Sequence, residues 1–324
     1  MIIKKRYIDG CFSCNSRLAP KYNKKIKSFP RVCVKCKTIN RTIVKNCPYC
    51  KSKKYEMWGR PVRNFFSAKC NSCGIVYIKN PLSNEGQNLF YKYYLTNVHQ
   101  KDKGKNKQRS KMYRLELDFL IKNMINFKKT KDILDVGCGG GYFLDLLKKE
   151  GKKTHGIEVV GTDSYLVAKR KHKMYFGEFD HKLKIKKKFD LIIFRGVIEH
   201  VKNPTGYVLK AQKLLKRGGY IFITATPNLD CAAAKIFKER WSLHRPESHL
   251  LHLSEEHVDK IFNKKSFLKV ASKSFYLDTP YENLEKDLVL ILNEIRKQKR
   301  KIKSDKISPA FFESMMTVLF KKNN

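Results

Sequence analysis

Residues 131–275 alternate between two hydrophobic periodicities, and this alternation predicts a sheet with crossover helices. Short apolar runs that are typical of buried strands occur at 132–137, 153–159, 189–194 and 220–226. Apolar residues recur at helical spacing in the intervening or following segments 142–151, 163–172, 205–215 and 255–266. Because strands that alternate with helices are typical of parallel sheets, the pattern predicts an α/β fold.

The flanking regions have different patterns and suggest the domain organisation. Residues 81–130 pass from a turn-rich start through a basic, polar stretch into 112–125, where apolar residues have helical spacing. We therefore expect a linker and helical lead-in there, and the main domain at 131–280. The lysine-rich residues 281–324 are expected to form a helical tail.

Composition supports a folded protein and leaves its charge open to two interpretations. The chain has 324 residues, of which 42% are hydrophobic, and its formal net charge is +41. A basic surface can bind a polyanion such as nucleic acid, but lysine is spread over every segment, which a general compositional bias also explains.

No uncharged apolar run reaches the length of a membrane span, and no signal-peptide pattern begins the chain, so we expect a cytoplasmic protein. Oligomeric state is not readable from the sequence.

Eight of the ten cysteines form four Cys-x-x-Cys pairs in the first 80 residues. The pairs are Cys11 and Cys14, Cys33 and Cys36, Cys47 and Cys50, and Cys70 and Cys73. Their spacing predicts two zinc ribbons, at 1–44 and 45–80, each holding one structural zinc ion through four thiolates. Interleaved pairing and redox-active thiols remain alternatives.

A glycine-rich loop, LDVGCGGGYF at 134–143, follows the first predicted strand. The dinucleotide fingerprint needs a third glycine where this chain has Tyr142, so that pattern does not fit. The spacing Asp-x-Gly-x-Gly-x-Gly does fit, and an acidic residue at the strand tip suits the ammonium group of S-adenosylmethionine. Glu158, at the end of the next strand, can accept both hydroxyls of a ribose.

Together with FDLI (189–192), EHVKNP (199–204) and LKRGGYIFITATPN (215–228), this loop resembles the class I, Rossmann-like S-adenosylmethionine-dependent methyltransferases. The resemblance covers roughly residues 130–275 and implies a Rossmann-like sheet. It also implies a set of cofactor-binding residues, namely Asp135, Gly137, Gly139, Gly141, Glu158 and Arg195.

The cysteine-rich leader and the segment RWSLHRPESHLLHLS (240–254) look like a bacterial subgroup of this family that often modifies cell-surface sugars. The resemblance implies a small-molecule acceptor, a sugar or nucleotide-linked sugar. The alternative is an RNA methyltransferase positioned by basic zinc ribbons.

Two histidines are candidate general bases, because histidine titrates near neutral pH. His200 follows the third of the predicted strands, and His249 lies in the segment after the fourth. Some quinone-pathway O-methyltransferases carry a Glu-x-x-Glu-His metal site where this chain has Gly196 to His200, with glycine in place of the first glutamate. Both histidines also have purely structural interpretations: His200 as a cap of the following turn, and His249 as a surface or packing residue.

Overall fold

The chain divides into two compact units, and the first combines the N-terminal residues with a short segment from the last third of the sequence. The computed structural model describes residues 18–20, 31–33, 41–63, 65–84, 86–87, 90–91, 103–159, 170–262 and 265–323. The first unit comprises residues 1–101 with 244–252, and the second comprises 102–243 with 253–324. None of the helices described is long and apolar enough to cross a membrane.

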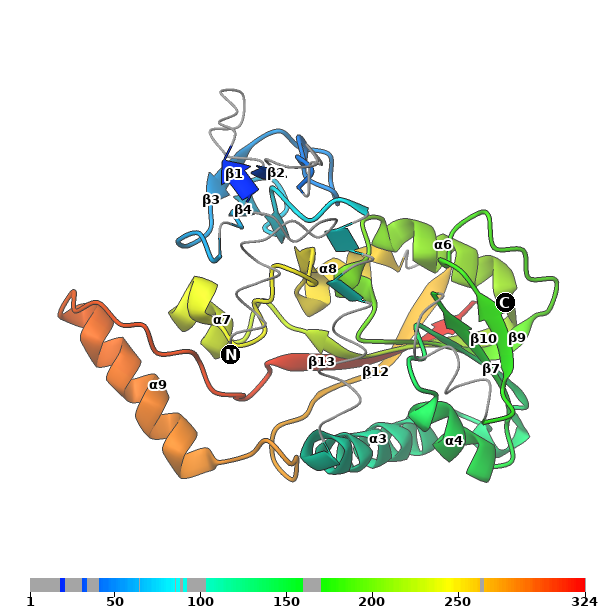
Figure 1. Ribbon diagram of the computed structural model, residues 1–324. Helices are drawn as coiled ribbons and strands as arrows, with labels where there is room; N and C mark the ends of the chain where they lie inside the picture. The colour runs from blue at the N-terminus through cyan, green and yellow to red at the C-terminus, as the bar shows by residue number, and fades with distance from the viewer. Residues whose placement is uncertain are drawn as a thin grey trace. The chain divides into compact units, whose positions relative to one another are not determined.

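The second unit is built on a seven-stranded sheet with the order β12-β13-β10-β9-β6-β7-β8 (Figure 1). Five of its strands run parallel: β6 (Asp132–Val136), β7 (Lys153–Glu158), β8 (Lys173–Phe176), β9 (Phe189–Arg195) and β10 (Leu215–Pro227). The expected strands and the α/β fold class are therefore confirmed. Most of β9 and β10 is buried, which explains why both read as continuous apolar runs.

Strand order reverses between β6 and β9, because the chain builds β7 and β8 on one side of β6 and returns to build β9 and β10 on the other. Such a reversal opens a crevice at the carboxyl ends of the strands, where open α/β sheets bind ligands. The glycine-rich loop leaves β6 at this edge.

Helices cover both faces of the sheet (Figure 1). Helix α3 (Lys103–Asn123) packs with α4 (Tyr142–Lys149) on one face, and α6 (Pro204–Leu214) packs with α8 (Glu255–Ile261) on the other. Local signals set the starts of two of them. Asn203 accepts a hydrogen bond from the Gly206 N–H ahead of a proline in the first turn of α6, and Ser254 caps α8.

The C-terminal region corrects the expectation of a helical tail at 281–324. Helix α9 (Leu284–Lys299) is present, but Met315–Lys322 forms strand β13, which pairs antiparallel with both β10 and β12 (Phe267–Ser274). The run from Met316 to Phe320 is fully buried in the sheet. A short apolar run can form a strand or a buried helical turn, and the lysine-rich surroundings hid the strand.

The first unit contains a four-stranded antiparallel sheet with the order β11-β5-β4-β3. Its strands are β3 (Tyr55–Met57), β4 (Ser67–Cys70), β5 (Val76–Ile78) and β11 (Leu251–His252). Strand β11 belongs to the segment 244–252 and pairs Leu251 with Tyr77. A two-stranded sheet of β1 (Leu18–Pro20) and β2 (Arg31–Cys33) lies in the same unit.

Candidate functional site

Three glycines shape the loop that joins β6 to α4. Gly137, Gly139 and Gly141 have φ angles of 70°, 52° and 75°, a backbone conformation that residues with a Cβ atom rarely adopt. A Cβ atom on Gly137 would lie 2.9 Å from Cγ2 of Val197, whereas one on Gly139 would meet no atom within 4 Å. Gly139 therefore presents bare backbone to open space, which allows close approach of a ligand.

Glu158 ends β7 beside this loop. One of its carboxylate oxygens accepts a hydrogen bond from the Gly139 N–H at 2.7 Å, and the other accepts from the Val159 N–H at 2.9 Å. The carboxylate is thus held at the loop by two backbone donors. Each oxygen retains a second lone pair for a ligand hydroxyl.

Asp135 lies on β6, and its carboxylate is buried. Within the described part of the chain, its Oδ1 has no accessible surface and no hydrogen-bond partner. Burial raises the pKa of Asp135 to about 8, although the positive charge of Arg195 opposes the shift. A buried acceptor without a partner is costly, so this oxygen is a candidate contact for a ligand donor.

Arg195 ends β9 and forms a bidentate ion pair with Glu116 of α3, at 2.6 and 3.2 Å. Its guanidinium also lies over the ring of Tyr113, 4.3 Å from the centroid. Burial raises the pKa of Tyr113. The positive charges of Arg195 and Arg109 lower this pKa, and the negative charges of Glu116 and Asp135 raise it. Helix α3 therefore contributes ionisable and aromatic groups to the carboxyl edge of the sheet.

The sequence analysis missed this contribution of α3. The only sequence signal was the pair of acidic residues in LELDFL (115–120), of which Glu116 is buried and Asp118 is exposed. In the described residues, Nη1 of Arg109 is another buried atom without a hydrogen-bond partner.

A second buried carboxylate, Glu199, follows β9 on the 3₁₀ turn η3 (Ile198–His200). Burial raises the pKa of Glu199 to about 8, despite a hydrogen bond that it accepts from the Thr226 hydroxyl. Nε2 of His200 lies 3.7 Å from Oε1 of Glu199. Ala225, which precedes Thr226, has a φ of 53°, at the point where the register between β10 and β13 shifts. Backbone strain of this kind is often found at functional sites.

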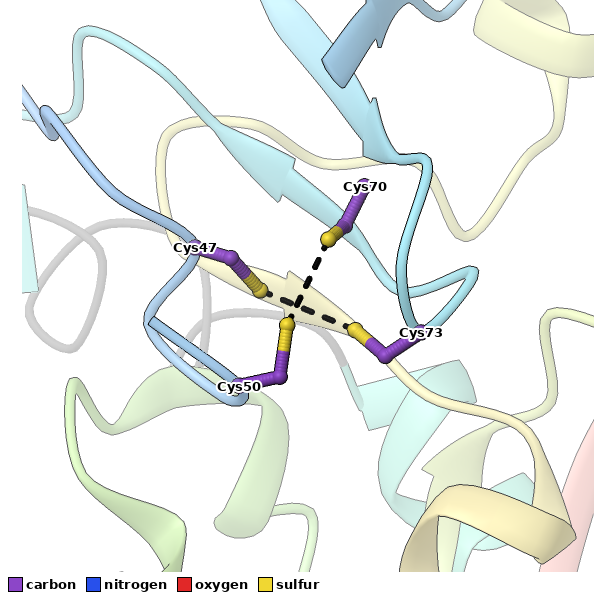
Figure 2. Close-up of side chains that lie close together, drawn as sticks. All are labelled: Cys47, Cys50, Cys70 and Cys73. Atoms are coloured by element: carbon purple, nitrogen blue, oxygen red, sulfur yellow. Dashed lines mark hydrogen bonds between the residues drawn. The ribbon is translucent and has the colours of Figure 1, made fainter. Parts of the chain in front are cut away.

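Cys47, Cys50, Cys70 and Cys73 of the first unit bring their sulfur atoms together (Figure 2). The Sγ–Sγ distance is 3.7 Å between Cys47 and Cys73 and 3.5 Å between Cys50 and Cys70. Burial disfavours the thiolate of Cys70, but hydrogen bonds from the backbone N–H groups of Cys73 and Ser72 lower its pKa to about 7. The four sulfurs could hold a tetrahedral metal ion. The other predicted zinc ribbon has Cys11, Cys14, Cys33 and Cys36 as its ligands. Cys11, Cys14 and Cys36 lie outside the described residues, as does the side chain of Cys33.

The predicted base His249 lies in the segment 244–252 and so belongs to the first unit, whereas His200 belongs to the second. Within the first unit, the ring of His249 lies 6.2 Å from that of His252, centroid to centroid. The side chains of His244 and Ser67 are hydrogen-bonded at 2.8 Å, and Glu247 pairs with Arg63 at 2.6 Å. These contacts attach the segment to the cysteine-bearing sheet.

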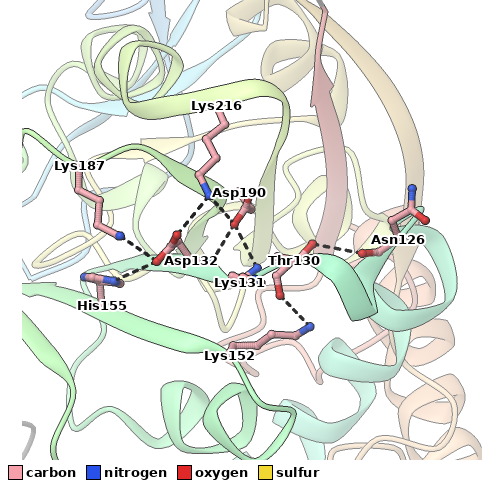
Figure 3. Close-up of polar contacts among 9 residues, drawn as sticks. All are labelled: Asn126, Thr130, Lys131, Asp132, Lys152, His155, Lys187, Asp190 and Lys216. Atoms are coloured by element: carbon pink, nitrogen blue, oxygen red, sulfur yellow. Dashed lines mark hydrogen bonds and ion pairs between the residues drawn. The ribbon is translucent and has the colours of Figure 1, made fainter.

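A further charged cluster lies at the opposite, amino edge of the parallel strands (Figure 3). Lys216 pairs with Asp132 at 3.2 Å and with Asp190 at 3.0 Å, and Lys187 pairs with Asp132 at 2.9 Å. The Asp190 carboxylate also accepts hydrogen bonds from the backbone N–H groups of Lys131 and Asp132. Its contacts are internal, so we assign this cluster to the stability of the sheet.

Residues 106–271 match the methyltransferase domain family, so the chain belongs to that family. A ubiquinone biosynthesis O-methyltransferase of Pelagibacter ubique (strain HTCC1062) is 34% identical over 112 residues, covering 33% of this chain and 46% of the relative. Another, of Hydrogenovibrio crunogenus (strain DSM 25203 / XCL-2), is 30% identical over 105 residues, covering 30% and 43%. The chain thus spans less than half the length of these curated relatives. The plantazolicin methyltransferase BpumL in complex with SAH has 17% identity and a TM-score of 0.46, covering 72% of this chain and 93% of that one.

The comparisons confirm the predicted methyltransferase class and correct the predicted acceptor. We expected a sugar or nucleotide-linked sugar, with RNA as the alternative. That expectation is wrong, because the curated relatives are named ubiquinone biosynthesis O-methyltransferases. The sugar was inferred from the cysteine-rich leader and the segment 240–254, and RNA from the basic zinc ribbons, although none of these segments lies in the sheet that carries the site.

The buried Asp135 carboxylate predicts how stability depends on pH. Its pKa rises from 3.8 to about 8 on folding, so the native state binds more protons than the unfolded state between these values, and stability falls as pH increases across this window. We expect Asp135→Asn to remove this part of the decline, so that its advantage over the wild type in urea unfolding grows from pH 4 to pH 8. A difference between the two proteins that is independent of pH would contradict this prediction.

Proposed function

We propose that this protein is an S-adenosylmethionine-dependent O-methyltransferase whose acceptor is a hydroxyl group on a small aromatic molecule of the quinone-precursor class. The observation that carries the proposal is the unpartnered Oδ1 of Asp135, buried beneath a glycine loop whose Gly139 faces open space. This combination provides an acceptor for a cationic donor and room for the group that bears it.

The described residues fit the cofactor in three ways. Asp135 would accept from the ammonium group, whose positive charge would favour the ionised carboxylate. The Glu158 carboxylate would accept from the ribose hydroxyls while its two backbone donors hold it in place. The Gly137, Gly139 and Gly141 backbone would allow close approach. The bound cofactor supplies an electrophilic methyl group on a positively charged sulfur. Arg195, fixed by Glu116, would close the methionine end of the site.

The acceptor class rests on the names of the relatives and on the groups at the carboxyl edge. An aromatic ring with two hydroxyl groups, ortho or para to each other, is the reduced form of a quinone, and a hydroxyl oxygen attacks a methyl group best after losing its proton. Glu199, with a pKa of about 8, and the neighbouring His200 are the candidate bases in this unit. His249 remains a predicted base on the segment 244–252.

The cysteine cluster is proposed to bind one structural zinc ion. A zinc–sulfur distance of about 2.3 Å in a regular tetrahedron separates the sulfurs by about 3.8 Å, close to the 3.5 and 3.7 Å in Figure 2. Four thiolates leave no position for substrate, so the ion would stabilise a unit with a small core. The second zinc site, at Cys11, Cys14, Cys33 and Cys36, rests on spacing alone. Reduced thiols at this density fit a cytoplasmic protein.

Binding of S-adenosylmethionine, measured by calorimetry, tests the cofactor assignment. Glu158→Gln should weaken binding by roughly 1–3 kcal/mol, because it removes a charged acceptor. Gly139→Val should weaken it further, because its side chain would fill the open space beside the loop. Glu150→Gln, an exposed position at the end of α4, is the matched control and should bind normally. Equal affinity of all four proteins would contradict the assignment.

Methyl transfer from labelled cofactor tests the acceptor class. We expect label on the oxygen of a catechol and none on the nitrogen of a matched aromatic amine. Turnover should rise with pH towards about 8, because Glu199 must lose its proton to act as a base. Glu199→Gln should abolish this rise. The variant His200→Gln tests separately whether His200, the second candidate base, is required. Label on the amine alone would exclude O-methylation.

Elemental analysis of the reduced protein tests the metal site. Cys47→Ser should carry one zinc ion fewer per chain than the wild type, because three thiolates hold zinc much less tightly than four. Cys231→Ser is the matched control: the Cys231 sulfur accepts a hydrogen bond from the Ala234 N–H at the start of α7 (Ala232–Phe237), a role that serine also performs. Equal zinc content in Cys47→Ser and the wild type would refute the site.

A further inference from the structure

The C-terminal region of the second unit concentrates exposed apolar side chains. Nine of the seventeen exposed large apolar residues among those described lie between positions 277 and 312. They are Leu277, Tyr281, Leu284, Leu288, Val289, Leu292, Ile302, Ile307 and Phe312. Four of them are on α9, which lies at the outer side of this unit beside α7 (Figure 1). An apolar patch of this kind on a protein surface usually marks an interaction site.

Helix α9 is attached to its own unit mainly by polar groups. Asp287 accepts a hydrogen bond from the Tyr276 hydroxyl at 2.7 Å, and Glu294 pairs with Arg240 at 2.5 Å. Both acidic side chains are on the buried side of the helix, with Ile291 between them. An amphipathic helix normally buries its apolar side, so the outward leucines of α9 are not used by the fold of this chain.

The exposed face of α9 has acidic and basic ends. Positions 285, 288, 292, 296 and 299 are spaced by three or four residues, so Glu285, Leu288, Leu292, Arg296 and Lys299 share one face. All five are exposed. The face therefore runs from a negative charge, across leucines, to positive charges.

We propose that this face pairs antiparallel with the same face of a second copy of this chain. Within α9, the pairs Glu285 and Arg296 and Val289 and Leu292 are each centred between residues 290 and 291. A two-fold axis at that point places the acidic end of each helix against the basic end of the other and brings the apolar centres together. Self-complementarity of this kind is what a two-fold interface requires.

Charge distinguishes this partner from an anionic lipid surface. On a membrane, Glu285 would face negative headgroups, whereas in the helix pair it faces Arg296 of the other copy. The net charge of +41 opposes association of two copies. At physiological ionic strength the screening length is about 8 Å, so contacts within the helix pair dominate over the distant charges.

Sedimentation velocity of the full chain at physiological ionic strength tests the pairing. The wild type should form dimers, and Leu292→Asp should be monomeric. Glu285→Arg and Arg296→Glu should each weaken the dimer at least about tenfold, because each turns two attractive pairs into repulsive ones. The double variant should recover the wild-type dimer. Glu285 and Arg296 lie three turns apart in one helix, so recovery must come from contacts between copies.

The matched control is Lys286→Glu, which changes the charge as Arg296→Glu does but lies off the face. It should dimerise like the wild type. A monomeric wild type, a dimer insensitive to Leu292→Asp, or a double variant weaker than both single variants would overturn the proposal. So would a monomeric wild type that sediments with phosphatidylglycerol vesicles and loses this binding in Leu292→Asp, which would assign the face to lipid. None of these outcomes depends on the proposed enzymatic function.

Discussion

The candidate site depends on one constraint, the common direction of β6, β7, β9 and β10. Parallel strands bring their carboxyl ends to one edge, and the reversal of strand order between β6 and β9 keeps the helices apart at that edge. Each of these strands then adds one group there: Asp135, Glu158, Arg195 and Thr226. Two carboxylates, at 135 and 199, are held there with pKa values near 8. The protein keeps these acidic groups in a costly environment at the edge where open α/β sheets bind ligands.

Much of this edge could be predicted from sequence because its determinants are local. The glycine spacing after an apolar run marks the loop, and Glu158 is recognisable as a strand-end carboxylate. Glu116 and Tyr113 were not predictable, because their roles arise from the packing of α3 against the end of β9, which no local pattern encodes. Strand β13 was missed for a similar reason: its pairing partners are remote in sequence, and its lysine-rich neighbours suggested a helix.

The cysteine-bearing unit shows the same division between local and tertiary information. Cys-x-x-Cys spacing predicted that the four sulfurs from 47 to 73 would come together, and they do. Nothing in the spacing indicated that the sheet of this unit would take a strand from residues 251–252. That strand brings His244, His249 and His252 into the same unit, so whatever stabilises the cysteine cluster also stabilises the segment that carries these histidines.

The remote origin of β11 also has a consequence for synthesis on the ribosome. Ser67 and His244, which are hydrogen-bonded in the first unit, are 177 residues apart in the chain. At about 5–20 residues per second, the nascent protein waits roughly 10–35 s between exposing the edge of β5 and producing the strand that covers it. During that interval the partial sheet presents unpaired backbone groups to other nascent chains. Early closure of the cysteine cluster would leave fewer of its residues free to pair wrongly while translation continues.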